Sequence, residues 1–358
     1  MQKLKVLIWW LGLAFTGALV LLVGGYSRLE AFAHEHRTLT LYLLLGALLV
    51  IPAKILALVS VYLIELLFVG WQRSSLRMLW KPEASVRLDI LSTLIMLLLP
   101  QRYLGYLLSF GLLYLIDLYA ARHFDISLTP LLGLWGLQLL CFLLLNSFLS
   151  YWVHRLEHAI PALWALHKFH HSADRLTILT TSRQTQLTKG IESGLMFLPM
   201  GLFTSPTAAL PVLGSAGFVA VGIYFAYHTL ISLNGGLCHS NLRTGYGWLG
   251  RWLIVSPRMH RLHHAMTPNY YNRNFGNDLV IWDRLFGTYA MCDADVDITT
   301  IAVGLHDNPF NQQPTLRGVL REYFLKTYWV CWQELRRGFA ALVPGRFGAP
   351  PVRDASGG

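Results

Sequence analysis

The sequence has little charge for its length. Only 13% of its 358 residues are charged and 54% are hydrophobic, whereas a soluble domain averages about 25% charged residues. Mean hydropathy is +0.45. This shortage of charge indicates a membrane protein. The net charge of +10 comes from basic residues scattered between apolar segments, which is typical of loops that flank membrane spans and argues against nucleic-acid binding.

Several common catalytic motifs are also missing. The four cysteines show no CxxC spacing, which argues against a disulfide framework and against a zinc knuckle. The sequence contains no nucleotide-binding glycine motif, no GxSxG and no HExxH. It has no flavin, haem or iron–sulfur motif either, so any redox chemistry would need electrons from a separate partner.

Histidine, in contrast, occurs in an ordered pattern of three boxes. The first box is HxxxH at 154–158, and HxxHH follows at 167–171 and 260–264. Chance would produce HxxHH only roughly 0.02 times in a chain of this composition. Residues at i, i+3 and i+4 share a helix face, so each box can direct its imidazoles at one point. The eight candidate ligands are His154, His158, His167, His170, His171, His260, His263 and His264.

The residue types point to a pair of metal ions. Imidazole binds iron, zinc, copper and nickel, and eight imidazoles are too many for one ion. Soluble di-iron bundles use several glutamates, but Glu157 is the only carboxylate inside a box. A histidine-only ligand set would leave two electrophilic ions able to bind dioxygen at open positions. The other histidines without helical partners are interpreted as interfacial polar residues: His34, His36, His123 and His306.

The apolar segments predict about six transmembrane or re-entrant helices. The positive-inside rule assigns residues 1–5 and the basic 70–88 loop to the cytoplasm, and six crossings then return all three boxes to that side. We interpret the first span as an anchor, because it is long for a signal peptide. Residues 326–343 predict an amphipathic interfacial helix. The expected spans are about 6–26, 41–69, 89–118, 130–153, 191–205 and 208–233.

Local patterns refine the candidate site. Ser256 and Pro257 predict the N-cap and first residue of a helix that carries the third box, with Pro268 ending it. His228 lies within an apolar run, where an ionisable group is either functional or bonded to a nearby carbonyl. His239 is ambiguous on spacing alone. The stretch 234–236, Asn-Gly-Gly, predicts a helix break that would let these two histidines approach each other.

These motifs resemble those of the fatty acid hydroxylase / sterol desaturase superfamily of integral membrane, non-haem di-iron enzymes. The resemblance covers about 130–290, and HSN at 239–241 is similar to an H-x-N element of bacterial members. One departure follows the second box, where Arg183-Gln184-Thr185-Gln186 replaces the usual arginine, His-Pro and acidic residue; it concerns the substrate side, not the metal site. The resemblance rests on HRLEH at 154–158, HKFHH at 167–171, SPRMHRLHH at 256–264, NFG at 274–276 and WDRLFGTY at 282–289.

The resemblance implies an all-α, multi-pass oxidoreductase whose cytoplasmic, histidine-rich helical cap holds two irons. It would be expected in a bacterial inner membrane. It would use dioxygen to hydroxylate or desaturate a C–H bond of a lipid, such as a sterol or fatty acyl chain. A ferredoxin or a cytochrome with its reductase would supply electrons. The implied ligands are the eight box histidines and His239, and His228 falls where some members place one more.

The chain is expected to divide into a transmembrane region (1–129), a catalytic domain (130–290) and an amphipathic helix with a disordered tail (291–358). Alternative classes are a zinc hydrolase, a metal transporter and a non-catalytic lipid-binding descendant. A zinc hydrolase would usually need HExxH, which is missing. A transporter would place its ligands near the membrane midplane, whereas the boxes lie at the membrane edge. A non-catalytic descendant would be expected to lose ligands, and the set is intact. Asp283 and Arg284 could orient ligands or be structural. Asp174 and Asn277 are close enough in sequence to bond ligand imidazoles.

Overall fold

The computed structural model describes residues 55–98, 135–185, 188, 230–308, 310–311, 316–321, 325 and 327–342. These residues form helices joined by turns and coil, with two isolated β-bridges. The all-helical prediction is therefore confirmed for the described part. None of the helices described there is both long enough and apolar enough to cross a membrane. The predicted spans 6–26 and 191–205, and large parts of the others except 130–153, lie outside the described residues.

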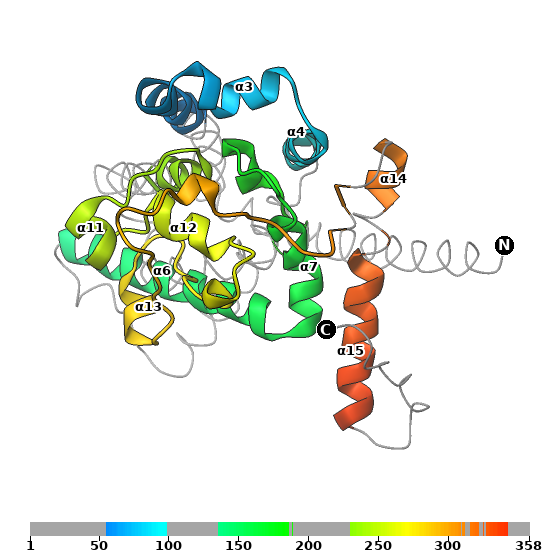
Figure 1. Ribbon diagram of the computed structural model, residues 1–358. Helices are drawn as coiled ribbons and strands as arrows, with labels where there is room; N and C mark the ends of the chain where they lie inside the picture. The colour runs from blue at the N-terminus through cyan, green and yellow to red at the C-terminus, as the bar shows by residue number, and fades with distance from the viewer. Residues whose placement is uncertain are drawn as a thin grey trace, which may run out of the picture.

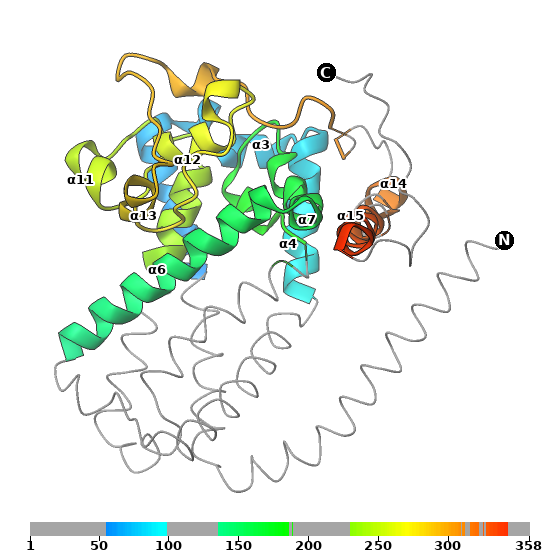
Figure 2. The same ribbon diagram turned by 90° about the horizontal axis from the view of Figure 1, so that it is seen from below.

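Two consecutive helices carry the first and second boxes. Helix α6 (Trp135–Ala159) continues from the apolar segment through both histidines of the first box, as predicted. Ile160 then caps helix α7 (Pro161–His171), which has proline in its first turn, where a backbone N–H would lack an intrahelical partner anyway. The two helices pack against each other. Figures 1 and 2 show α7 turning away from the end of α6.

Helix α15 (Thr327–Leu342) lies alongside α7 (Figures 1 and 2). Its buried face includes Cys331, which packs with Ala162, Ala165 and Leu166 of α7. The helix predicted at 326–343 is thus confirmed to within one residue at each end. Trp329 and Trp332 lie on its exposed surface. One face of α15 therefore stabilises the helix that carries the second box, and another presents large apolar side chains.

The basic 70–88 segment is itself largely helical and leads into α4. It contains η1 (Trp71–Arg73) and α3 (Ser75–Trp80), and α4 (Ala84–Leu98) begins five residues before the predicted span at 89–118. Ser74 caps α3 by accepting from the Arg77 N–H. A helix precedes this segment at 55–69.

A fully buried ion pair joins α4 to the end of α7. Arg183, which follows η3 (Ile178–Ser182), lies 3.2 Å from the Asp89 carboxylate, and both side chains have no exposed surface. The guanidinium also donates to the carbonyl oxygens of Phe169 and Ser172 at the C-terminal end of α7. Arg183 therefore anchors the C-terminal end of the helix that carries the second box.

The third box lies on a short, capped helix. Helix α12 (Pro257–His263) begins as predicted, with the Ser256 side chain accepting from the Met259 N–H. It ends sooner than predicted: His264 is the C-cap, and Pro268 instead begins η5 (Pro268–Tyr270). The remaining elements of this half are α11 (Gly247–Trp252), α13 (Ile281–Leu285), η6 (Ile298–Thr300) and α14 (Leu316–Arg321).

The predicted helix break at 234–236 is wrong. Residues 230–239 form one uninterrupted helix. Gly236 packs closely on the 55–69 helix, because a Cβ there would lie 3.0 Å from the Val61 side chain and would force it to shift. The helix is therefore intact where a break would have let His228 approach His239, and His228 itself lies outside the described residues.

The buried ion pair yields a stability prediction. Arg183→Ala leaves Asp89 buried without its cation, which typically costs about 3–5 kcal/mol of unfolding free energy. Thermal melts in detergent measure this. The matched control is Arg175→Ala, which breaks an exposed pair with Glu83 and should cost under about 1 kcal/mol. Equal melting temperatures for the two variants would contradict the assigned role of Arg183.

Candidate metal centre

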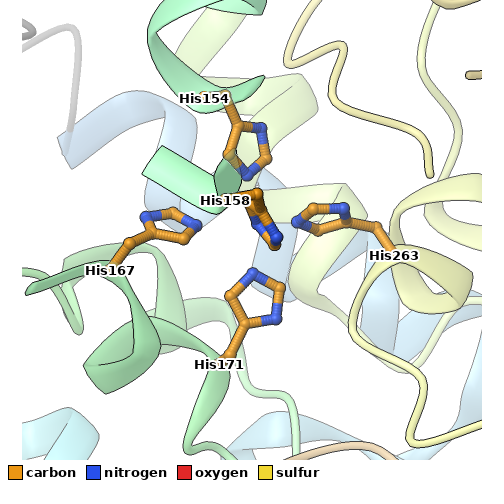
Figure 3. Close-up of side chains that lie close together, drawn as sticks. All are labelled: His154, His158, His167, His171 and His263. Atoms are coloured by element: carbon orange, nitrogen blue, oxygen red, sulfur yellow. The ribbon is translucent and has the colours of Figure 1, made fainter. Parts of the chain in front are cut away.

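The structure brings nine histidines together in two adjacent groups. Within each group the candidate ligand atoms all lie within 4.8 Å of one another. In Figure 3 the rings of the larger group converge on one point from α6, α7 and α12. The five-histidine group is His154, His158, His167, His171 and His263, and the four-histidine group is His170, His239, His260 and His264. The eight box histidines and His239 are all included.

The second and third boxes are each divided between the two groups. From α7, His167 and His171 join the five-histidine group and His170 joins the four-histidine group. From α12 and its C-cap the division is reversed, because His263 joins the first group and His260 and His264 join the second. The prediction that each box aims at one point is therefore wrong for these two. The groups touch: the His171 and His264 rings stack with centroids 4.5 Å apart.

Hydrogen bonds to backbone carbonyls orient three of the rings. The Nδ1 of His154 lies 2.8 Å from the Phe275 carbonyl oxygen, and the Nδ1 of His263 lies 2.8 Å from that of Arg273. The Nδ1 of His239 lies 2.9 Å from the Gly235 carbonyl oxygen. A carbonyl can only accept, so Nδ1 carries the hydrogen in each case. The Nε2 lone pair is then directed into the group, as a metal ligand requires.

A carboxylate fixes a fourth ring. A carboxylate oxygen of Glu157 lies 2.9 Å from the Nδ1 of His167, and both side chains are buried. This contact crosses the turn between α6 and α7, so the sequence spacing of Glu157, next to His158, did not predict it. The negative charge favours a cation in the five-histidine group. Asp174 and Asn277 do not fill this role: their described hydrogen bonds go to Asn311 and Ser150.

Burial favours the neutral form of six imidazoles. It lowers the pKa values of six rings well below the ordinary range, and neighbouring histidines add to the effect. The six are His158, His170, His171, His260, His263 and His264. A neutral ring with Nδ1–H has a lone pair on Nε2, which is the form that binds a metal.

The distances between ring nitrogens fit metal ions. In the four-histidine group the Nε2 of His260 lies 2.9 Å from that of His239 and 3.2 Å from that of His264. Lone pairs this close repel unless a cation or proton lies between them. A metal–nitrogen bond of about 2.0–2.1 Å places neighbouring ligand nitrogens roughly 3 Å apart. In the five-histidine group, the buried Nε2 atoms of His158, His171 and His263 have no hydrogen-bond partner among the described residues.

Two aromatic side chains wall the five-histidine group: Phe275, which belongs to the NFG motif, and Trp164, which no sequence pattern identified. The Phe275 ring lies 5.2 Å from that of His158, centroid to centroid, and also contacts the rings of His154 and His263. The Trp164 ring lies 5.0 Å from His158 and 5.4 Å from His171. These rings limit the access of water, which strengthens electrostatic interactions inside the group.

Comparison with known proteins agrees with this geometry. The fatty acid hydroxylase family model matches residues 139–288. Ornithine lipid hydroxylase OlsE of Rhizobium tropici is 34% identical over 152 residues, 42% of this chain and 41% of that protein. Alkylglycerol monooxygenase of Xenopus tropicalis is 31% identical over 140 residues, 39% and 27% of the two chains. Delta(7)-sterol 5(6)-desaturase of Leptosphaeria maculans is 26% identical over 153 residues, 43% and 37%.

The chain covers 27% to 41% of the length of these three relatives. No solved structure matches it. The matched region runs from α6 to the end of the WDRLFGT segment, and it contains all nine histidines of the two groups. Over residues 139–288, the sequence of this chain is therefore similar to that of the fatty acid hydroxylase family.

Proposed function

We propose that this protein is a membrane-bound, O₂-dependent lipid hydroxylase with two irons, one in each histidine group. The observation that carries the proposal is the pair of adjacent groups, five and four buried histidines, with ligand atoms close enough to share an ion. The two irons would supply the redox chemistry that activates dioxygen. Imidazole suits iron, and adjacent groups on shared helices suit a reaction that uses two metals together.

The chain's own residues would position and shield the reaction. The nine histidines would hold the ions, and the carbonyls of residues 235, 273 and 275 would fix three of the rings. Glu157 would partly balance the cationic charge through His167. Trp164 and Phe275 would exclude water beside the five-histidine group. His228 remains a further candidate ligand.

The substrate class follows from the relatives. Their printed names share lipid substrates, and two of the three name a hydroxylase or monooxygenase, which favours hydroxylation over desaturation. One oxygen atom would enter the lipid C–H bond and the other would leave as water. This takes two electrons and two protons, which we assign to a separate ferredoxin or cytochrome with its reductase. We retain the expected catalytic domain (130–290), the six membrane crossings and the cytoplasmic orientation as parts of the proposal.

Activity provides the first test. Iron-loaded protein in bilayers, given dioxygen and a reducing system, should produce oxidised lipid that carries one atom of ¹⁸O from ¹⁸O₂. The His260→Ala/His263→Ala/His264→Ala variant removes ligands from both groups and should lose product to background, as mass spectrometry would show. Full activity in this triple variant would refute the proposal. Zinc-loaded protein is expected to be inactive, since zinc has no redox chemistry.

Metal content provides the second test. Wild-type protein should bind close to two metals per chain after loading with Fe²⁺ and desalting. His158→Ala and His239→Ala each remove a ligand from a different group, so each should lower mainly one site's occupancy. His306→Ala is the matched control, because His306 is exposed and bonds Tyr271 rather than either group. Elemental analysis should give wild-type content for this control, and an equal loss there would count against the assignment.

Burial of the imidazoles also predicts how stability depends on pH. Their folded-state pKa values lie below the unfolded value of about 6.5, so below that pH the unfolded chain binds more protons. The metal-free protein therefore has its full stability above about pH 6.5 and loses stability as the pH falls through the folded-state pKa values of the imidazoles. Melting temperatures from pH 8 to pH 5 measure this. A flat profile, or greater stability in acid, would contradict it.

Asp278 should act in the opposite direction. Burial raises the pKa of Asp278 to about 7, so its folded form binds a proton that the unfolded form has lost. Its contribution to stability is lost as the pH rises from about 4 through about 7. An Asp278→Asn background removes this effect and should steepen the loss of stability in acid. No change of slope in that variant would contradict the effect assigned to Asp278.

A further inference from the structure

We propose that Asp283 is a positioning residue for the five-histidine group, and that it acts through the backbone of the 273–276 loop. The inference rests on the proposed metal centre. Asp283 lies in WDRLFGT, a segment with no candidate ligand, yet its carboxylate is fully buried. The path from this carboxylate to the candidate ligands consists of described hydrogen bonds.

The 273–276 loop orients ligands from two different helices. Its carbonyls at Arg273 and Phe275 accept from the Nδ1 atoms of His263 and His154, each at 2.8 Å. Alternate carbonyls of one short loop thus fix a ligand of the third box and a ligand of the first. Asn274 between them has φ 59, a left-handed conformation that asparagine tolerates better than most residues. The loop must therefore be held firmly for either ring to keep its direction.

Asp283 supplies that hold through both of its oxygens. The Phe275 N–H donates to Oδ1 and the Gly276 N–H donates to Oδ2, each at 2.8 Å. The Gly276 N–H belongs to the same peptide unit as the Phe275 carbonyl. That unit is planar and rigid, so Asp283 holds one end of it while His154 bonds the other. Bonds aligned in this way polarise one another, which strengthens the bond to His154.

The loop is shaped to bring its backbone to this carboxylate. A Cβ at Gly276 would lie 2.7 Å from Asp283 Oδ2 and 2.7 Å from the Leu279 carbonyl oxygen. Glycine is required there for close approach. The NFG and WDRLFGT segments therefore act as one unit. The loop that contains NFG provides carbonyl acceptors for the imidazoles, and Asp283 of WDRLFGT holds that loop in place.

A second route ties the same carboxylate to the helix of the first box. The Thr288 hydroxyl donates to Asp283 Oδ1 at 2.7 Å and lies 3.0 Å from the Tyr151 hydroxyl. Tyr151 lies one turn before His154 on α6, and Arg155 donates to its hydroxyl at 2.9 Å. Asp283 thus contacts the 273–276 loop directly. Through Thr288 it also connects to the turn of α6 that carries His154, the ring that this loop orients. None of its described hydrogen bonds leads to the four-histidine group, where His239 bonds Gly235 instead.

The test is site-selective. Protein loaded with ⁵⁷Fe should give two Mössbauer quadrupole doublets, one per group, assigned by their loss in His158→Ala and in His239→Ala. Asp283→Asn keeps the shape, but its amide nitrogen can only donate, so either the Phe275 N–H or the Gly276 N–H loses its acceptor. We expect iron affinity at the doublet lost in His158→Ala to fall about 10–100-fold, with the other doublet retained.

The matched control is Asp89→Asn. Asp89 is also a fully buried carboxylate with several donors, from Thr177, Thr180 and Arg183, but it does not contact the 273–276 loop. The Asp89→Asn variant should have a lower melting temperature, while its two Mössbauer doublets keep equal areas. If both variants show the same selective loss, or if Asp283→Asn loses both doublets equally, the positioning role is overturned.

A milder variant covers the case in which Asp283→Asn does not fold. Thr288→Val removes one donor to Asp283 and should broaden or shift the same doublet; unchanged spectra would overturn the inference. The outcomes also separate this inference from the proposed function. If wild-type protein binds fewer than two irons, or if His158→Ala and His239→Ala do not affect different doublets, the proposed centre fails. If those controls behave as expected and only Asp283→Asn is normal, the positioning role alone fails.

Discussion

The fold depends on burying nine imidazoles in two groups and on fixing the directions of their rings. A neutral imidazole has one N–H, and a ring that directs Nε2 inward must place that hydrogen on Nδ1. Each buried Nδ1–H then needs an acceptor, because an unsatisfied buried donor costs about 1–3 kcal/mol. The carbonyls of Phe275, Arg273 and Gly235 meet this need for three rings, and the carboxylate of Glu157 lies 2.9 Å from the Nδ1 of a fourth, His167. The three carbonyl acceptors lie outside the histidine boxes, so the site recruits other parts of the chain.

Dividing the boxes between two groups couples the two sites. Because α7 and α12 each contribute to both groups, neither site can move without the other. The helices are short, at 11 and 7 residues, and depend on tertiary contacts for stability. Arg183 and α15 anchor α7, while Ser256 and the loop after α12 anchor the third box. The separation of the two groups is therefore set by how these two helices pack.

Sequence patterns predicted which histidines come together better than they predicted the surroundings of the rings. HxxHH and HxxxH identified eight of the nine histidines that the structure groups, and His239 entered only through the family resemblance of HSN. The patterns failed where geometry depends on packing. They assigned all the imidazoles of a box to one point. Helical periodicity shows which residues share a face, but not which of the two groups each ring on that face joins. The patterns predicted a break at Gly235-Gly236, since glycine serves turns and close contacts equally. They could not find the carbonyl acceptors, because every residue has one.

The extent of the family match has a structural explanation in the network around Asp283. The matched region begins in α6 and ends at residue 288. Thr288 bonds Asp283, and both connect back to α6 through the Tyr151 hydroxyl and through the Phe275 carbonyl at His154. The C-terminal end of the matched region thus bonds α6 beside the first box and next to the five-histidine group. Helix α15 lies beyond the matched region and packs on α7, so it can support the site without supplying any of the candidate ligands. A chain that ended before Asp283 would keep all nine histidines yet lose the hold on the loop that orients two of them.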